Sequence, residues 1–98
     1  MPTFIYLTSW TDQGAQEPAR AVERATGAVE NLEKMGVKIF EVYWTSGGYD
    51  LVMVAECDDE ETAFAASLDM ASRGNVRSTM LRAFDSNEMA RILAKLPS

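Results

Sequence analysis

The sequence predicts an α+β fold of the ferredoxin-like type, in which helices cover one face of a four-stranded antiparallel sheet. Strand-like and helix-like segments alternate in the order βαββαβ, and one further helix follows. Gly47-Gly48 lies between the second and third strands, where a short hairpin turn needs residues that accept positive φ. Right-handed crossovers place the ferredoxin-like arrangement first among the possible topologies. The 98 residues are expected to form a single domain, 1–98.

The first strand and the first long helix are indicated by residue type and by the segments that interrupt them. Thr3–Trp10 is rich in β-branched and aromatic residues, which favours a strand, and Thr11-Asp12-Gln13-Gly14 ends it. A helix is expected from about Glu17 to Met35, with Pro18 in its first turn and Gly36 as its stop. Its inward positions at helical spacing are Val22, Ala25 or Thr26, Val29 and Leu32.

The second and third strands are expected to form a hairpin. They cover Val37–Thr45 and Asp50–Glu56, on either side of the glycine pair. A two-residue turn would place Trp44 opposite Leu51.

The second half of the chain repeats the alternation and then adds a helix. A helix begins at about residue 58 or 59 and ends at Gly74-Asn75, and Val76–Phe84 is the fourth strand. Asp85-Ser86-Asn87-Glu88 has the pattern of a capping box and opens the last helix. The side chains expected to point inward are Phe64, Leu68 and Ala71 on the earlier helix and Met89, Ile92, Leu93 and Leu96 on the last one.

Strand alternation assigns the side chains to two faces of the sheet. The predicted helix-facing set is Ile5, Leu7, Phe40, Val42, Trp44, Leu51, Met53, Ala55, Leu81 and Ala83. The predicted open set is Phe4, Tyr6, Thr8, Trp10, Glu41, Tyr43, Thr45, Asp50, Val52, Val54, Ser78, Met80 and Arg82. The open set is too apolar to face water alone. We expect a second copy to cover it, giving a homodimer or a higher multiple; the alternative is the last helix folding over it.

Composition and charge exclude several classes of protein. The net charge of −6 disfavours binding to nucleic acid or to an anionic membrane surface. The chain has no histidine, which excludes Ser-His-Asp and Cys-His systems and imidazole ligands for zinc or haem. Asp58-Asp59-Glu60-Glu61 lacks the spacing of a metal-binding loop and is typical of an acidic first helical turn. We therefore expect no metal and no cofactor.

The single cysteine, Cys57, excludes an intramolecular disulfide and is expected to be a buried thiol. No apolar run reaches the ~18 residues of a membrane span, and no leader pattern is present. A cytoplasmic location is the resulting expectation.

The segment Trp44-Thr45-Ser46-Gly47-Gly48-Tyr49-Asp50 resembles the GYD-domain family, named for the Gly-Tyr-Asp found here as Gly48-Tyr49-Asp50. The resemblance covers nearly the whole chain, although the alanine- and arginine-rich first helix departs from the family pattern. It implies a small soluble bacterial or archaeal protein with a ferredoxin-like fold, in the wider group of dimeric α/β barrels, and it implies no activity. The supporting segments are Thr8-Ser9-Trp10-Thr11-Asp12-Gln13-Gly14, Gly74-Asn75-Val76-Arg77 and Leu81-Arg82-Ala83-Phe84.

Two functions stay open at this point. The first is an oligomeric small-molecule-binding or regulatory module, favoured by the lack of a nucleophile–base pair and of metal ligands. The second is a cofactor-free enzyme, monooxygenase- or isomerase-like, acting on a small aromatic or carboxylate compound. Families neighbouring the resemblance include both kinds, and the fold does not choose between them.

The candidate site residues come from the predicted open face. Asp50 is the candidate acid–base group, because nearby rings would raise the pKa of its carboxyl; the alternative is that it caps the glycine turn. Tyr43 is the second catalytic candidate, and Arg82 suits an anionic group. Trp10 and Trp44 offer stacking surfaces, with core packing as the alternative. The predicted ligand-binding set is Tyr6, Thr8, Trp10, Tyr43, Thr45, Tyr49, Asp50 and Arg82.

Overall fold

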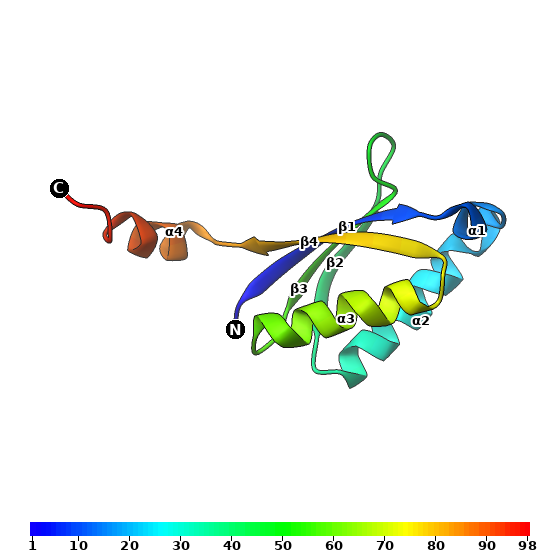
Figure 1. The fold of residues 1–98 in the computed structure, drawn as a ribbon, viewed down its shortest axis with the longest axis horizontal. Helices are drawn as coiled ribbons and strands as arrows, with labels where there is room; N and C mark the ends of the chain where they lie inside the picture. Colours follow the sequence, from blue (N-terminus) through cyan, green and yellow to red (C-terminus); the bar gives the residue numbers. More distant parts are fainter.

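The computed structural model describes residues 1–98 and contains one antiparallel sheet with the strand order β2-β3-β1-β4. Figure 1 shows α2 and α3 together on one face of this sheet, which confirms the predicted ferredoxin-like α+β fold. The elements are β1 (Thr3–Trp10), α1 (Asp12–Ala15), the 3-10 turn η1 (Pro18–Arg20), α2 (Ala21–Lys34), β2 (Lys38–Trp44), β3 (Leu51–Glu56), α3 (Glu60–Ser72), β4 (Val76–Ala83) and α4 (Ser86–Leu93).

The helix ends follow local side-chain chemistry. The Asp59 carboxylate accepts a hydrogen bond from Thr62 N at 2.7 Å and so caps α3. The capping box is confirmed, because Asp85 and Glu88 each accept a hydrogen bond from the other's backbone N–H. The first long helix begins four residues later than expected, at Ala21, since Pro18 starts a separate 3-10 turn.

The core lies between the sheet and the helices, and its largest member is Tyr6. This side chain is 0% exposed, and its hydroxyl donates a hydrogen bond of 2.7 Å to Ala63 O on α3. Phe4 and Thr8 are buried beside it, so the predicted face of β1 is wrong. Ile5 and Leu7 lie on the open face instead. Both alternating sets of β1 are apolar, and the alternation alone therefore did not determine which one faces the helices.

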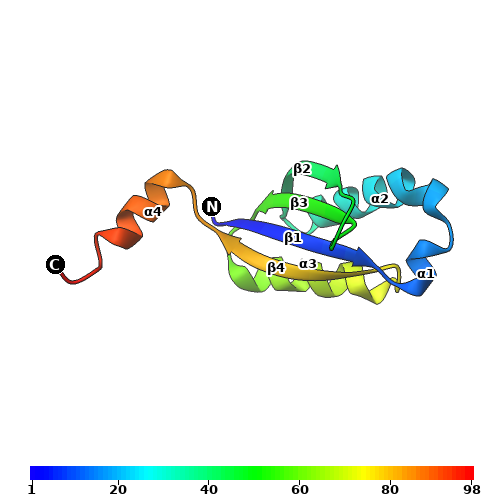
Figure 2. The same ribbon diagram turned by 90° about the horizontal axis from the view of Figure 1, so that it is seen from above.

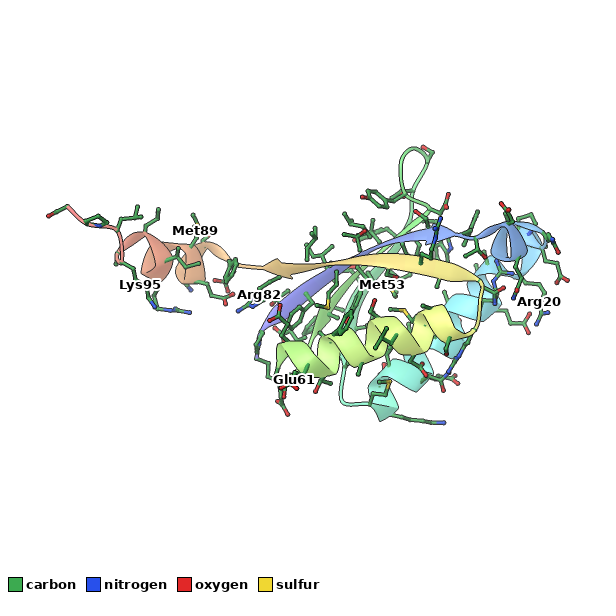
Figure 3. The ribbon with its side chains drawn as sticks, in the orientation of Figure 1. Arg20, Met53, Glu61, Arg82, Met89 and Lys95 are labelled. Atoms are coloured by element: carbon green, nitrogen blue, oxygen red, sulfur yellow. The ribbon has the colours of Figure 1, made fainter.

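The error in β1 carries over to β4, its neighbour in the sheet. Met80 is opposite Tyr6 and Arg82 is opposite Phe4, so both lie on the helix face. Leu81, expected in the core, pairs with Ile5 on the open face. In β3 the prediction is confirmed, since Leu51, Met53 and Ala55 are buried; Met53 lies under the sheet in Figure 3.

The second strand contains an irregularity that the sequence did not predict. The register with β3 shifts between Ile39 and Glu41, so Phe40 leaves the helix-facing row and stays exposed. Val42 and Trp44 keep their predicted face, and Trp44 pairs with Leu51 as expected.

Helix α3 buries a different stripe from the predicted one. Ala63, Ala66 and Met70 face the sheet, whereas Phe64 and Leu68 are 54% and 56% exposed. The bulky rings of β1 fill the space under α3, so small side chains are needed there.

On α2 the expectation for Leu32 and Ala25 is confirmed and that for Val22 is wrong, because Val22 is exposed.

Helix α4 does not pack on its own chain. Figure 2 shows it extending past the end of the sheet as an arm, and none of its residues is buried. Figure 3 places Met89 on this arm and Arg82 at its junction with the sheet. The expected inward packing of Met89, Ile92, Leu93 and Leu96 is therefore wrong within one chain, and α4 does not cover the open face.

Replacing Tyr6 by Phe should lower the free energy of unfolding by about 1 kcal/mol, because the ring stays packed while the hydrogen bond to Ala63 O is lost. Burial raises the pKa of Tyr6 from 10.0 to about 12. Its protonated form therefore stabilises the fold fully below pH 10, and this stabilisation is lost as the pH rises from 10 to 12. Urea unfolding across this window should show a steeper loss for wild type than for Tyr6→Phe; parallel curves would contradict the assignment.

Candidate functional site

The predicted ligand-binding residues do not share one face. Tyr6, Thr8 and Arg82 lie on the helix face, with Tyr6 inside the core, while Tyr43 lies on the open face opposite Val52. The prediction that these residues line one pocket on the open face is therefore wrong. The side chains of β1 and β4 point to the faces opposite to those expected, as a shift of one residue along the strand would produce. Thr45 and Tyr49 lie on the loop between β2 and β3, which rises above the sheet on the side away from the helices (Figure 1).

Asp50 is held by backbone groups at the end of this loop. Its carboxylate accepts a hydrogen bond from Trp10 N at 2.9 Å, and its own N–H donates to Thr8 O at 2.9 Å. Its carbonyl accepts from Thr45 N at 3.0 Å. Asp50 thus ties the hairpin to β1, which is a structural use of the carboxylate.

Arg82 is engaged in the junction between β4 and α4. Its guanidinium donates to Glu88 Oε2 at 3.1 Å and to Thr3 O at 3.3 Å, and it stacks 4.4 Å from the centre of the Phe84 ring. The Asp85 N–H and the Arg82 guanidinium hold the pKa of the Glu88 carboxyl below its usual range. The predicted anion-binding arginine therefore anchors the start of the arm.

An apolar cavity lies on the helix face, between the sheet and α2. It has a volume of about 270 Å³, and the two indoles of Trp10 and Trp44 line it. Leu51, Met53, Met70 and Val76 add apolar surface. Trp10 and Thr8 are thus predicted ligand-binding residues that do line a cavity, on the opposite face from the one expected.

Helix α2 forms the far wall of this cavity with very small side chains. Ala21, Ala25, Gly27 and Ala28 line it, and a Cβ added at Gly27 would meet no atom within 4 Å. Such short side chains leave the space between helix and sheet unfilled. The sequence analysis did not predict this wall, although the recurrence of small residues at helical spacing could have indicated it.

The polar groups at the cavity include one cation without a carboxylate partner. Arg24 Nη2 donates to Gly14 O at 2.8 Å and Nη1 donates to Glu17 O at 3.2 Å. No carboxylate oxygen lies within 4.0 Å of its guanidinium, whereas Arg73 is paired with Asp69 at 3.1 Å. Arg24 therefore keeps a positive charge that the protein orients without neutralising it.

Segments far apart in the chain meet beside this cavity. Thr11 N donates to Asn75 O at 3.0 Å, and the Thr11 hydroxyl donates to Gly74 O at 2.5 Å. Gly14 packs so closely on this connection that a Cβ there would lie 2.1 Å from Asn75 O. A side chain at position 14 cannot fit, so the glycine is required for the close approach.

The open face of the sheet has no cover in the chain. Its centre consists of half-buried aliphatic side chains, and Tyr43 and Leu81 beside them are 57% and 42% exposed. Tyr43 is little buried, and the nearby Glu41 carboxylate raises the pKa of the Tyr43 phenol. The aliphatic side chains are Ile5, Leu7, Val52 and Val54.

Three further features bear on function. No group of three or more His, Cys, Asp and Glu side chains comes together as a metal site. Every helix is too short or too polar to cross a membrane. Cys57 is buried as a free thiol, as expected, and burial raises its pKa.

Comparisons with known proteins agree with this architecture. A protein of Thermus thermophilus named glutamine synthetase and cystathionine beta-lyase binding protein is 38% identical over 97 residues, which is 98% of this chain and 99% of that protein. No solved structure matches the chain. The family model of the GYD domain matches residues 4–93. This match covers nearly the whole fold, including the hairpin, the cavity and the open face, and the chain therefore belongs to the GYD-domain family.

Proposed function

We propose that this chain is a binding and regulatory module of one domain, which works as a homodimer and docks on a partner enzyme. The observation that carries the proposal is the apolar open face, which no element of the chain covers. Surfaces of this kind are typical of sites for protein association. The name of the Thermus thermophilus relative, a binding protein for two enzymes, supports the same class of function. A cytoplasmic location fits the free thiol of Cys57, which a reducing compartment preserves.

The engagement of the candidate catalytic groups favours binding over catalysis. The carboxylate of Asp50, the first catalytic candidate, accepts from Trp10 N, and Tyr43, the second, is exposed on the open face beside Glu41 and does not line the cavity. Two of the predicted ligand-binding groups are engaged as well, since the Tyr6 hydroxyl donates to Ala63 O and Arg82 pairs with Glu88. A general acid or base needs to reach a substrate proton, which these contacts oppose.

A second copy is the proposed cover of the open face. The face measures roughly 20 Å along its strands and ~19 Å across four of them, or about 400 Å² of flat area. A standard interface buries about 800 Å² on each partner. The α4 arm carries Met89 and Leu93 exposed and extends beyond the sheet, so it adds apolar area to a face-to-face dimer.

The outer side of α3 is the proposed docking surface for the enzyme. Phe64 and Leu68 are one helical turn apart and both more than half exposed. They lie on the helix side of the sheet, so a dimer through the open face leaves them free (Figure 1). Glu60 and Glu61 precede them, with Glu61 at the start of α3 in Figure 3. The fitting partner surface is an apolar groove with a basic rim.

Replacing Val52 by Asp should convert the dimer into a monomer, because the charge would be buried between two sheets. Light scattering during size-exclusion chromatography at micromolar concentration measures the mass. Leu68→Asp is the matched control and should stay dimeric, since it adds the same charge on the opposite side of the sheet. A monomeric wild type, or a dimeric Val52→Asp that retains the wild-type circular dichroism, would contradict the proposed assembly.

Replacing Leu68 by Asp should weaken binding to the glutamine synthetase of the same organism by at least about tenfold, as expected for an interface anchor. Calorimetric titration of the two purified proteins measures this. Val22→Asp is the control, because Val22 is a similarly exposed aliphatic residue on α2. Equal weakening by both substitutions, or no binding by wild type, would refute docking through α3.

Replacing Asp50 by Ala should lower the free energy of unfolding by about 2 kcal/mol, because Trp10 N loses a charged acceptor. Asp50→Asn keeps an acceptor oxygen and should lose less than about 1 kcal/mol. Both losses are read from urea unfolding, and enzyme binding should be retained in Asp50→Asn. Two variants as stable as wild type would show that the carboxylate is not structural and would reopen the catalytic alternative.

A further inference from the structure

We infer that the cavity between α2 and the sheet binds a small planar aromatic carboxylate. This inference rests on the proposed binding function and names a ligand class for it. Trp10 and Trp44 are the only tryptophans of the chain, and both line the cavity. Indole faces favour stacking on flat aromatic rings, and the thioethers of Met53 and Met70 add soft apolar contacts.

The size and shape of the cavity restrict the ligand. Its volume of about 270 Å³ lies just below the range of roughly 300–1,000 Å³ typical of sites for drug-sized molecules. Four of the α2 residues that line it carry at most one methyl group, namely Ala21, Ala25, Gly27 and Ala28, and the other two are Arg24 and Asn31. A cavity of this size suits one ring or two fused rings.

The charge at the cavity selects an acidic group on that ring. Arg24 is held by two backbone carbonyls, which fix its direction and leave its charge uncompensated. Arg24, Arg77 and Arg91 are the three arginines without an ion pair, and Arg24 is the one of them that lines the cavity. A guanidinium binds a carboxylate through charged hydrogen bonds, so Arg24 is the group that would orient the acid. Asn75 and Thr8 also line the cavity, but the Thr8 hydroxyl is hydrogen-bonded to Ser78 Oγ at 2.9 Å and Asn75 Oδ1 accepts from Gln13 Nε2 at 3.2 Å, which leaves Arg24 as the group for the acid.

Titration with sodium 2-naphthoate tests this inference, with the neutral 2-naphthamide as the matched probe. The two indole N–H signals in a nitrogen–proton correlation spectrum report on the cavity, since one comes from each tryptophan. Naphthoate should shift both signals saturably, and the amide should bind about tenfold more weakly, because it lacks the charge for Arg24. No saturable shift with naphthoate at millimolar concentration would overturn the inference.

Three variants locate the site and assign the charge. Ala28→Leu should abolish binding of both probes by filling the slot, whereas Thr26→Leu, on the exposed side of the same helix, should not change it. Arg24→Gln should weaken naphthoate about tenfold and leave naphthamide unchanged, and Arg24→Lys should restore part of the difference. Binding that survives Ala28→Leu, or equal weakening of both probes by Arg24→Gln, would overturn the inference. These outcomes are independent of dimerisation and enzyme docking, so failure here leaves those results intact and the reverse also holds.

Discussion

The close contact between β1 and α3 is the interaction on which the arrangement of the helices depends. Tyr6 occupies the space between them, and its hydroxyl reaches Ala63 O on the helix. A ring of this size can be accommodated only if the helix presents small side chains, which Ala63 and Ala66 provide. Two of the three large apolar residues of α3 are consequently turned outward, while Met70 stays in the core. Phe64 and Leu68 are therefore available for a partner because the core beneath them is already full.

Helix α2 packs less closely on the sheet than α3 does, and the space left between them is the cavity. Here the helix also carries small residues, but the facing indoles of Trp10 and Trp44 do not fill the gap. The helix is held at its ends instead, by Leu32 in the core and by the bonds of Arg24 to the preceding turns. The same residue type thus gives tight packing on one helix and an open slot on the other, depending on whether the sheet supplies a ring that reaches the helix.

What the sequence could predict depends on how far apart in the chain the interacting residues lie. The hairpin pairing of Trp44 with Leu51 and the capping box at Asp85 depend on neighbours in the chain, and both were predicted correctly. The face of β1 depends on residues tens of positions away, and both of its alternating sets are apolar. A sheet with one face toward its helices and an apolar open face loses the polar alternation that normally fixes the register. The predicted placement of the candidate site on the open face was wrong for the same reason, because it depended on the face assigned to Tyr6 and Arg82.

Strand β2 contributes side chains to both faces of the sheet. Like β4, this edge strand pairs with only one neighbour, and it is the strand that contains the irregularity, at Phe40. Its adjacent residues Tyr43 and Trp44 point to opposite faces, one toward the proposed dimer partner and one into the cavity. Neighbouring residues share a peptide plane, and a displacement of the Trp44 backbone therefore moves Tyr43 as well. The proposed cavity and the proposed dimer face therefore share this strand, with Trp44 on one side of it and Tyr43 on the other.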